Sequence, residues 1–492
     1  MNRFARPILS ITLLTLFWQG LCAAQPSQLP DFGSKADSVL SKSREAQLGR
    51  GVMLQLRNAG AVIEDPQLTE YIQVLGSKLA SQANDGDFNF NFFVVGDQEI
   101  NAFALPGGYV GVNAGLITAS DNESELAGVL AHEVSHVTQR HIARSMYDNQ
   151  RMSIVSIATM LAAIVLGAAT GAGSQATSGL LAAGQAATMQ RQINFTREHE
   201  AEADRVGMDV LAAAGFDPNG MATFFEKLSR RYGLASENVP EMLQSHPVTT
   251  SRIAEARARA RQLPRVEHVD STGYGLAKAR LLVLTAPTPE AAVALFEPKA
   301  DSQDPADRYG RALSLIGVAR GDEAERLFRG LVDENPHIIA YRIGQAEALM
   351  SSGLYDQALE IYAEAARLFP RNVPLIISYA DSLITAGQPG LAHEILLDLL
   401  NNVRPTPEQI RLIARAANAE GDVVNAYQYM SEYYLSIGDL RLAIAQLQLA
   451  LESPDATPVE RVRFEARMKE IVEYLPDDER ADRRHPDPEP QP

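Results

Sequence analysis

The sequence predicts a mainly α-helical protein in two parts, an α+β domain with a small sheet followed by an all-α solenoid. Two observations predict this fold class. Residues 132–136 read His-Glu-Val-Ser-His within a run of apolar residues at helical spacing. The second half of the chain repeats glycines and alanines at a step of 34 residues, which is typical of stacked helical hairpins. The length of 492 residues allows two or three domains with full cores.

The first 24 residues predict a secretory signal peptide. Two arginines precede a short apolar core, Ile8–Trp18, and small residues then lead to a cleavage site before Gln25. The apolar core is too short for a comfortable membrane span. Cys22 is the only cysteine, so the mature chain has no disulfide framework and no thiol site. We therefore expect an exported protein, with a linker over residues 25–42 ahead of the first domain.

The overall charge excludes one class of function. The chain has 44 lysines and arginines against 61 aspartates and glutamates, a formal net charge of −17. Such a chain repels the phosphate backbone, so we expect no nucleic-acid partner.

Residues 101–117 predict a β-hairpin or an edge strand. The stretch is rich in apolar and small residues around Pro106-Gly107-Gly108. An open sheet edge beside a metal site can hold an extended peptide as an added strand, through backbone hydrogen bonds alone. An ordinary hairpin in the core is an equally good interpretation of the same residues.

A metal-binding helix is predicted around His132 and His136. Imidazoles four residues apart lie one turn apart on one helix face, so both can reach a single metal ion, with Glu133 beside them as a proton acceptor. Ser120 and Glu123 have the Ser-x-x-Glu spacing of a capping box, which predicts where this helix begins. Apolar residues at helical spacing suit burial of the same helix: Leu126, Leu130, Val134 and Val137.

Residues 152–190 carry no charged side chain and are dominated by small and apolar residues. We expect an apolar helix over 153–166, a glycine-rich turn over 167–178 and a second, weaker helix over 179–189. The interrupted pattern favours a hairpin of helices or a lid near the metal site. A transient, peripheral membrane contact and a true membrane span are the alternatives.

The third metal ligand is predicted on a helix that runs to Ala214 and is ended by Gly215. A catalytic zinc site has three protein ligands and one open position. Glu200 and Asp204 share one face, so we expect Glu200 to bind the metal and Asp204 to accept a hydrogen bond from a ligand imidazole. Spacing alone leaves the other acids of this segment, and its histidine, open as ligands. The side chains expected to face solvent are His141, Glu198, His199 and Glu202.

These motifs resemble those of the M48 family of zinc metallopeptidases. That family pairs His-Glu-x-x-His with a later Glu-x-x-Ala-Asp, and residues 132–136 and 200–204 follow both patterns in order. Residues 101–110 resemble the family's segment ahead of the metal helix. Ser245-His246-Pro247 and the following Arg252 resemble a segment after it.

The resemblance covers about residues 43–261 and implies a zincin-like metallopeptidase domain, which we expect over residues 43–265. It implies one Zn²⁺ ion, and it makes Glu200 the third ligand beside the two histidines of the motif.

The reaction that this resemblance implies is metal-assisted peptide hydrolysis. Zinc lowers the pKa of bound water toward about 7 and polarises the scissile carbonyl, while Glu133 takes a proton and passes it to the leaving amine. His246 and Arg252 are the candidates for stabilising the oxyanion. Both could instead be structural, as a loop histidine and an arginine in a surface ion pair. A further role is open to His246, which as a fourth ligand would displace the water and leave the site at rest switched off.

The second half of the chain predicts tetratricopeptide repeats, expected as a solenoid over residues 266–475 and followed by a disordered tail over 476–492. The positions that share the 34-residue step are Gly353, Gly387 and Gly421, then Ala324, Ala358, Ala392 and Ala426, and finally Pro336 and Pro370. A solenoid of this kind usually holds a peptide or a protein partner, and a purely structural domain is the alternative.

The combination of the two parts in one exported chain resembles the periplasmic β-barrel assembly-enhancing protease family. The resemblance implies a periplasmic zinc endopeptidase that degrades misassembled outer-membrane β-barrel proteins and aids their assembly. Its partners would be those client proteins and the β-barrel assembly machinery, held by the repeats. Two other functions remain open, a chaperone or adaptor whose metal site is largely silent, and a membrane-associated processing peptidase.

Overall fold

The structure, a computed structural model, describes residues 35–83, 88–148, 197–232, 241–403 and 405–474. Three predicted segments lie outside the described residues: the signal peptide over 1–24, the uncharged stretch over 152–190 and the tail over 476–492. Among the helices that the structure describes, none is both long enough and apolar enough to cross a membrane.

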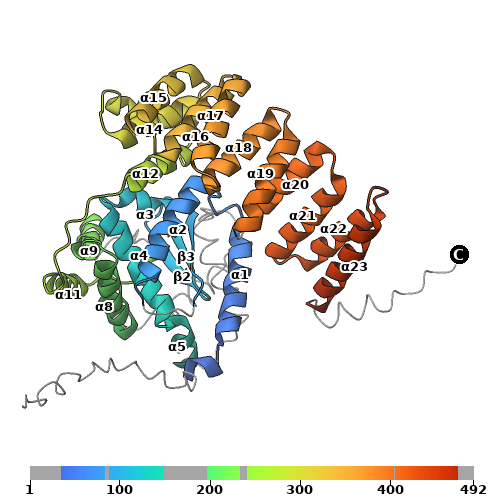
Figure 1. Ribbon diagram of the computed structural model, residues 1–492. Helices are drawn as coiled ribbons and strands as arrows, with labels where there is room; N and C mark the ends of the chain where they lie inside the picture. Colours follow the sequence, from blue (N-terminus) through green and yellow to red (C-terminus); the bar gives the residue numbers. More distant parts are fainter. Residues whose placement is uncertain (1–34, 84–87, 149–196, 233–240, 404, 475–492) are drawn as a thin grey trace, which may run out of the picture.

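The first part of the chain is an α+β domain, which confirms the predicted fold class (Figure 1). Its elements are η1 Lys35–Ser38, α1 Lys42–Asn58, α2 Pro66–Ala80, β1 Asn91–Val95, β2 Ala102–Leu105, β3 Tyr109–Asn113, α3 Ala114–Ala119, α4 Glu123–Thr138, α5 His141–Asp148, α8 Arg197–Ala213, α9 Asn219–Tyr232, α10 Glu241–Ser245 and α11 Thr250–Ala260. One hydrophobic core joins α2, α4, α8 and α9 to the sheet.

The sheet has three described strands in the order β1-β3-β2. β1 pairs parallel with β3, and β2 pairs antiparallel with β3, so the predicted hairpin is present and β2 lies at the edge. Gly107 and Gly108 form its turn at φ values of +79° and +88°, which other residues adopt only with strain. The prediction was wrong beyond residue 113, where α3 begins. Leu116 and Ile117 are both fully buried in α3, and apolar neighbours of this kind suit a buried helix as well as a strand that is covered on both faces.

Helix α4 is the central helix of this domain, and every one of its residues is buried. It packs against α2, α8, α9 and β2. Small residues allow the close approach of the neighbouring helices. A Cβ atom at Gly128 would lie 2.9 Å from the backbone nitrogen of Met221 in α9, and one at Gly207 in α8 would lie 3.1 Å from the backbone of Ala131. The metal motif is therefore fixed by backbone packing on several sides.

The start of α4 corrects one prediction. The N-cap is Asn122, whose side-chain oxygen accepts a hydrogen bond from the backbone N–H of Glu125 at 3.0 Å. Ser120 ends α3 instead, and its hydroxyl donates to the carbonyl oxygen of Ile117 at 2.8 Å. Helix α4 therefore begins two residues later than the pattern predicts, because Ser120 lies at the end of α3 and the side chain of Asn122 provides the cap.

The second part of the chain is a curved row of antiparallel helices (Figure 1). They are α12 Thr272–Leu284, α13 Pro289–Phe296, η2 Glu297–Lys299, α14 Pro305–Gly317, α15 Gly321–Glu334, α16 Ile339–Ser351, α17 Tyr355–Leu368, α18 Val373–Thr385, α19 Pro389–Asn402, α20 Pro407–Glu420, α21 Val423–Ser436, α22 Leu440–Glu452 and α23 Pro458–Glu473. The repeated glycines lie in the turns between helices with positive φ: Gly353, Gly387 and Gly421. The repeated alanines are buried where helices cross: Ala324, Ala358, Ala392 and Ala426.

Helix α12 joins the two parts. Tyr274 and Leu281 belong to the core of the first domain, while Leu276 and Ala279 belong to the first core of the solenoid. The hydroxyl of Tyr274 donates to the carbonyl oxygen of Ser120 at 2.8 Å. The boundary predicted at residue 265 thus precedes a helix that is packed on both sides, and this double packing fixes the base of the solenoid to the domain.

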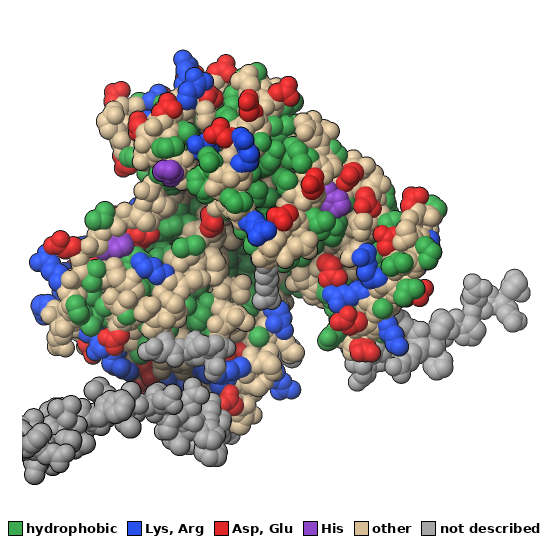
Figure 2. All heavy atoms as spheres, in the orientation of Figure 1, with side chains coloured by type: hydrophobic (Ala, Val, Ile, Leu, Met, Phe, Trp, Pro, Cys, Tyr) green, Lys and Arg blue, Asp and Glu red, His purple; other side chains and the backbone are tan. Residues whose placement is uncertain are grey.

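The solenoid curves back over the first domain, and α18 contacts α2 (Figure 1). A cavity of about 680 Å³ lies between the residues that lead into α2 and the helices α18, α20 and α21. Its lining mixes charged and apolar groups, among them Glu64, Pro66, Asp381, Arg411 and Tyr427. Figure 2 shows acidic and basic side chains interspersed over the visible face of the solenoid.

Candidate metal centre

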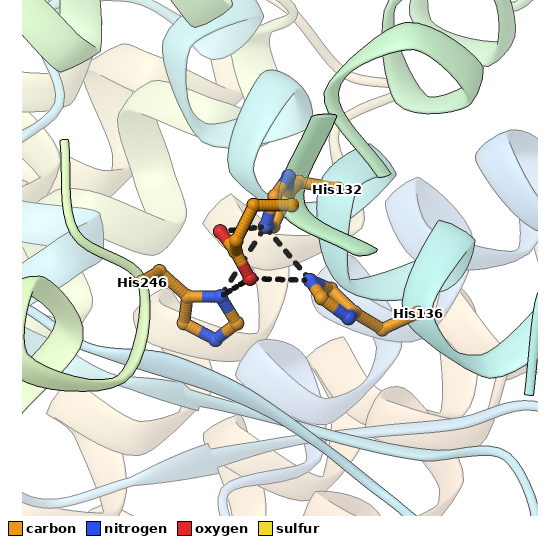
Figure 3. A group of neighbouring side chains, drawn as sticks. His132, His136 and His246 are labelled. Carbon is orange, nitrogen blue, oxygen red and sulfur yellow. Dashed lines mark hydrogen bonds and ion pairs between the residues drawn. The ribbon is translucent and has the colours of Figure 1, made fainter. Parts of the chain in front are cut away.

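His132 and His136 lie one turn apart on α4 and bring their Nε2 atoms to 2.9 Å from each other. Both rings are buried inside the domain. Figure 3 shows the two rings converging with that of His246. Two unprotonated ring nitrogens repel each other at this distance, so the arrangement requires either a proton or a cation between them.

Glu200 on α8 completes the predicted set of ligands. Its Oε1 atom lies 3.5 Å from Nε2 of His136, and its Oε2 atom lies 3.6 Å from Nε2 of His132. Helix α8 can come this close to α4 because Gly207 lies against the backbone of Ala131. Helix packing, and not local sequence, therefore brings together residues that are 64 positions apart.

His246, which directly follows α10, enters the same cluster as a fourth donor. Its Nδ1 atom lies 2.8 Å from Oε1 of Glu200 and 3.4 Å from Nε2 of His132 (Figure 3). One ligand atom from each of the four side chains lies within 4.8 Å of the others. Two nitrogens of one helix, a carboxylate and a third imidazole form the donor set that Zn²⁺ prefers in proteins.

The pKa values of the two rings shift in opposite directions, which indicates that the cluster accommodates one positive charge. Burial acts to lower the pKa of His132, but hydrogen bonds to Asp204 and Glu200 outweigh it and raise the pKa to about 10. Burial and the neighbouring His132 hold the pKa of His136 well below its usual value. Burial acts to raise the pKa of Glu200, but His246 and His132 outweigh it and hold that pKa well below its usual value. A metal cation would supply the same charge without a proton, so these residues fit a metal ion.

Glu133 lies beside the cluster and is fully buried. Neither of its carboxylate oxygens has a hydrogen-bond partner among the described residues, and Nε2 of His246 is 3.9 Å from the nearer one. Burial raises the pKa of Glu133, which His246 and His132 oppose only in part. A buried carboxylate without a hydrogen bond is costly to the fold, so its presence here indicates a chemical task.

Asp204 and Arg252 contact the predicted ligands His132 and Glu200. Oδ1 of Asp204 lies 3.0 Å from Nδ1 of His132, which is the contact predicted from the spacing of Glu200 and Asp204. Arg252 donates to both oxygens of Asp204, at 2.7 and 2.8 Å, and its third nitrogen lies 2.8 Å from Oε2 of Glu200. The guanidinium also donates to the carbonyl oxygen of Pro247 at 2.9 Å. Arg252 is thus engaged by Glu200 and Asp204, and of the two roles that the sequence left open this is the ion-pair role, in a buried setting and not at the surface.

Two of the side chains expected in solvent are in fact buried: His141 and His199. Their rings stack with centroids 4.5 Å apart, and Nδ1 of His141 lies 2.9 Å from Nδ1 of His136. Glu202 is partly buried and contacts His141, while Glu198 is exposed as expected. The prediction for His141 assumed that α4 continues, but the chain turns at Arg140 with φ +53° and α5 begins at His141. No periodicity in the sequence signals this turn.

The fold and this buried donor cluster define a metallopeptidase. Residues 66–260 match peptidase family M48, and residues 349–416 match a tetratricopeptide repeat family. The chain is 36% identical over 450 residues to the β-barrel assembly-enhancing protease of Escherichia coli (strain K12), covering 90% of this chain and 91% of the relative. It is 41% identical over 336 residues to a putative β-barrel assembly-enhancing protease of Vibrio cholerae, covering 67% and 69% of the two chains.

A more distant relative matches over less than half of the chain. The mitochondrial metalloendopeptidase OMA1 of Arabidopsis thaliana is 25% identical over 217 residues, covering 44% of this chain and 41% of the relative. The chain belongs to peptidase family M48, in the group of its members that join the peptidase domain to tetratricopeptide repeats. It is a metalloendopeptidase.

Proposed function

We propose that this protein is a periplasmic zinc endopeptidase that degrades misassembled outer-membrane β-barrel proteins and aids the assembly of others. The observation that carries the proposal is the buried cluster of His132, His136 and Glu200 beside the unpaired carboxylate of Glu133. The names of the bacterial relatives supply the class of client, and the predicted signal peptide supports export. The working division of the chain is a peptidase domain over residues 43–265 and a solenoid over 266–475.

The three ligands that we assign to the metal are His132, His136 and Glu200, with Asp204 fixing the ring of His132. Zinc, when bound, supplies a Lewis acid that polarises the scissile carbonyl and acidifies water. Glu133 accepts the proton of the attacking water on its carboxylate and transfers it to the nitrogen of the leaving amine. Its raised pKa suits this exchange, because a carboxylate that must both accept and release a proton works best near the ambient pH.

His246 and Arg252 receive separate roles. We assign Arg252 to the positioning of Glu200 and Asp204, since its donors are occupied by them and by Pro247. We assign His246 to the fourth donor position, where it covers Glu133 and closes the site at rest. The alternative is that His246 donates to the oxyanion during the reaction. The two roles predict opposite effects of removing the ring.

The edge strand β2 is the proposed track for the substrate. β2 pairs with β3 on one side, and α4 lies against it. An extended peptide that adds to this edge would form backbone hydrogen bonds along Ala102–Leu105 and pass beside the metal centre. Recognition through the backbone tolerates many side chains, which suits clients that share strand-forming sequences and little else.

The solenoid is the proposed site for partners, either client proteins or the β-barrel assembly machinery. Its concave side forms the cavity of about 680 Å³ against the start of α2, so a bound segment would lie next to the peptidase domain. Acidic and basic residues both line this cavity, among them Asp381 and Arg415. Apolar residues line it as well, so the cavity suits a segment that carries both polar and apolar side chains.

The substitution Glu133→Gln tests the proposal. Purified wild-type protein with zinc should cleave an unfolded outer-membrane β-barrel protein, and the variant should cleave it about 10²–10⁴-fold more slowly, because general-base catalysis is lost. Metal content by mass spectrometry should be the same in both, since Glu133 is not a ligand. Unchanged cleavage by the variant would contradict the role of Glu133, and a zinc-loaded wild type that binds the client without cleaving it would favour a chaperone or adaptor. Membrane extraction with carbonate separates the third possibility, since only a membrane-anchored peptidase would resist release.

A further inference from the structure

The ring of His136 has a second contact that faces away from the metal cluster. Its Nε2 atom points at His132 and Glu200, so Nε2 is the atom available to a metal. Its other nitrogen, Nδ1, lies 2.9 Å from Nδ1 of His141, and the two rings meet edge to face. A histidine that binds a metal through Nε2 carries its proton on Nδ1, so Nδ1 of His136 is the donor and Nδ1 of His141 the acceptor.

The remaining contacts of His141 agree with this direction. A neutral imidazole that accepts at Nδ1 carries its proton on Nε2. Nε2 of His141 lies 3.2 Å from Oε2 of Glu202, and the same oxygen accepts a hydrogen bond from Arg144 at 2.7 Å. The hydrogen bonds thus form a series from His136 through His141 and Glu202 to Arg144, in which every bond has one donor and one acceptor. The opposite tautomer of His141 would place two N–H groups face to face at 2.9 Å.

The turn after α4 places His141 where the series requires it. An uninterrupted helix would carry residue 141 away from the ligand face, because a step of five residues is 140° past a full turn. The chain instead turns at Arg140, at φ +53°, a conformation that a residue with a side chain adopts only when the surrounding contacts enforce it. Arg140 is held there by hydrogen bonds to Asp37, Glu45 and the carbonyl oxygen of Leu40.

The other ligand ring is held differently. Nδ1 of His132 contacts the carboxylate of Asp204 directly, and Arg252 clamps that carboxylate. His136 reaches its carboxylate, Glu202, only through the second imidazole, and Arg144 takes the place of Arg252. Each of the two ligand histidines is thus linked to a carboxylate that is paired with an arginine, directly for His132 and through one more imidazole for His136. The support of His132 returns to the cluster, because Arg252 also contacts Glu200, whereas His141 and Glu202 lie outside the four side chains of the cluster.

We propose that His141 is a positioning residue for the metal centre, which fixes the tautomer and the angle of His136, with Glu202 and Arg144 fixing His141 in turn. The proposal rests on the proposed function, since it requires that His136 is a metal ligand. Partners of a ligand histidine that lie outside the ligand set commonly change metal affinity by about 10- to 100-fold. The predicted effect of losing the acceptor is therefore a loss of metal affinity in a protein that is still folded.

Two substitutions at His141 separate the hydrogen bond from the packing. His141→Phe keeps a ring to stack on His199 and removes the acceptor, and should weaken zinc and cobalt binding by about 10- to 100-fold. His141→Asn places an amide oxygen at the position of Nδ1 and should bind both metals within about threefold of the wild type. Affinity is measured by competition with a chelating dye. The absorption spectrum of the bound Co²⁺ reports the geometry of the ligands. This spectrum should change in His141→Phe if His141 positions His136, and should stay the same if the substitution only lowers the stability of the fold.

Glu202→Ala gives a second test that does not disturb the core, because Glu202 is partly exposed. Loss of its carboxylate lets His141 adopt the wrong tautomer, so metal affinity should fall by about 3- to 10-fold. Glu198→Ala removes the same charge from the exposed side of the same helix and should leave affinity unchanged. If circular dichroism shows that His141→Phe does not fold, the comparison of Glu202→Ala with Glu198→Ala tests the positioning role instead.

The outcomes are distinct. A wild-type protein that takes up neither zinc nor cobalt would refute the proposed function, and this inference with it. Wild-type binding together with undiminished affinity and an unchanged Co²⁺ spectrum in His141→Phe and in Glu202→Ala would refute the positioning role alone. Loss in His141→Phe with recovery in His141→Asn is the result expected.

Discussion

The candidate metal centre and the solenoid are built from different kinds of contact. The centre gathers ionisable side chains from α4, α8 and the residue after α10, and His132 and His246 are 114 positions apart in the chain. The solenoid stacks each helix on its neighbours in the sequence and repeats one set of small residues every 34 positions. The first arrangement concentrates charge in a buried place, and the second spreads weak apolar contacts over a long row. The cost of a substitution should therefore depend on the region in which it is made.

The largest difference is expected between two arginines. Arg252→Leu removes the partner of two buried carboxylates, Asp204 and Glu200, and should lower the free energy of unfolding of the metal-free protein by about 3–5 kcal/mol. Arg329→Leu in the solenoid removes a pair with Glu325 in which the arginine is 62% exposed, and should cost at most about 1 kcal/mol. Urea unfolding followed by circular dichroism measures both. Similar costs would show that the buried charges are hydrated and that the contrast between the regions is false.

A smaller effect is expected from filling space between helices of the solenoid. A Cβ atom at Gly344 in α16 would lie 2.3 Å from the buried ring of Phe328 in α15, so Gly344→Ala should lower the free energy of unfolding by about 1–3 kcal/mol. Metal affinity should not change, because the strain stays within neighbouring repeats. Gly51→Ala is the matched control in α1, where a Cβ atom meets nothing within 4 Å, and should stabilise the protein by about 0.5–1 kcal/mol. A change in zinc affinity in Gly344→Ala would show that strain crosses α12 into the peptidase domain.

The smallest energetic effect is expected for His246, the one residue of the cluster that does not lie on a long helix. His246 follows the five-residue helix α10, so its ring is supported less firmly than the rings on α4. If His246 closes the site at rest, His246→Ala should raise basal hydrolysis of a short peptide by about threefold or more, equivalent to about 0.7 kcal/mol in the barrier. A lower rate with unchanged zinc content would instead assign His246 to the oxyanion.

The sequence predicted correctly those features that depend on the backbone geometry of a few neighbouring residues. The spacing of His132 and His136 places two rings on one helix face because a helix repeats every 3.6 residues, and that geometry is local. The positive φ of Gly353 and its repeats is also local, since only glycine adopts it without strain. Glu200 and Asp204 follow from the same rule once the second helix is recognised, although nothing in that rule fixes how far α8 lies from α4.

The sequence was misleading where the outcome depends on competition between distant groups. Ser120 has the spacing of a cap, but it ends α3, and Asn122 caps α4. His141 falls off the ligand face of an ideal helix, but α4 ends at Thr138, and the turn at Arg140 brings His141 back beneath His136. Contacts with Asp37 and Glu45, about 100 positions earlier, stabilise that turn, so no window of local sequence contains the cause.

The sequence by itself determined a helix that carries two imidazoles one turn apart with a carboxylate beside them, a later carboxylate at matching spacing, and a row of helical repeats. These are consequences of helical periodicity and of glycine's conformational freedom, which act over a few residues. Only the tertiary structure decided that α8 brings Glu200 to the rings, that His246 joins them, that His141 supports His136 from behind, and that α12 belongs to both cores. Those arrangements depend on which buried polar group finds which partner, and that choice is made by the packing of the whole chain.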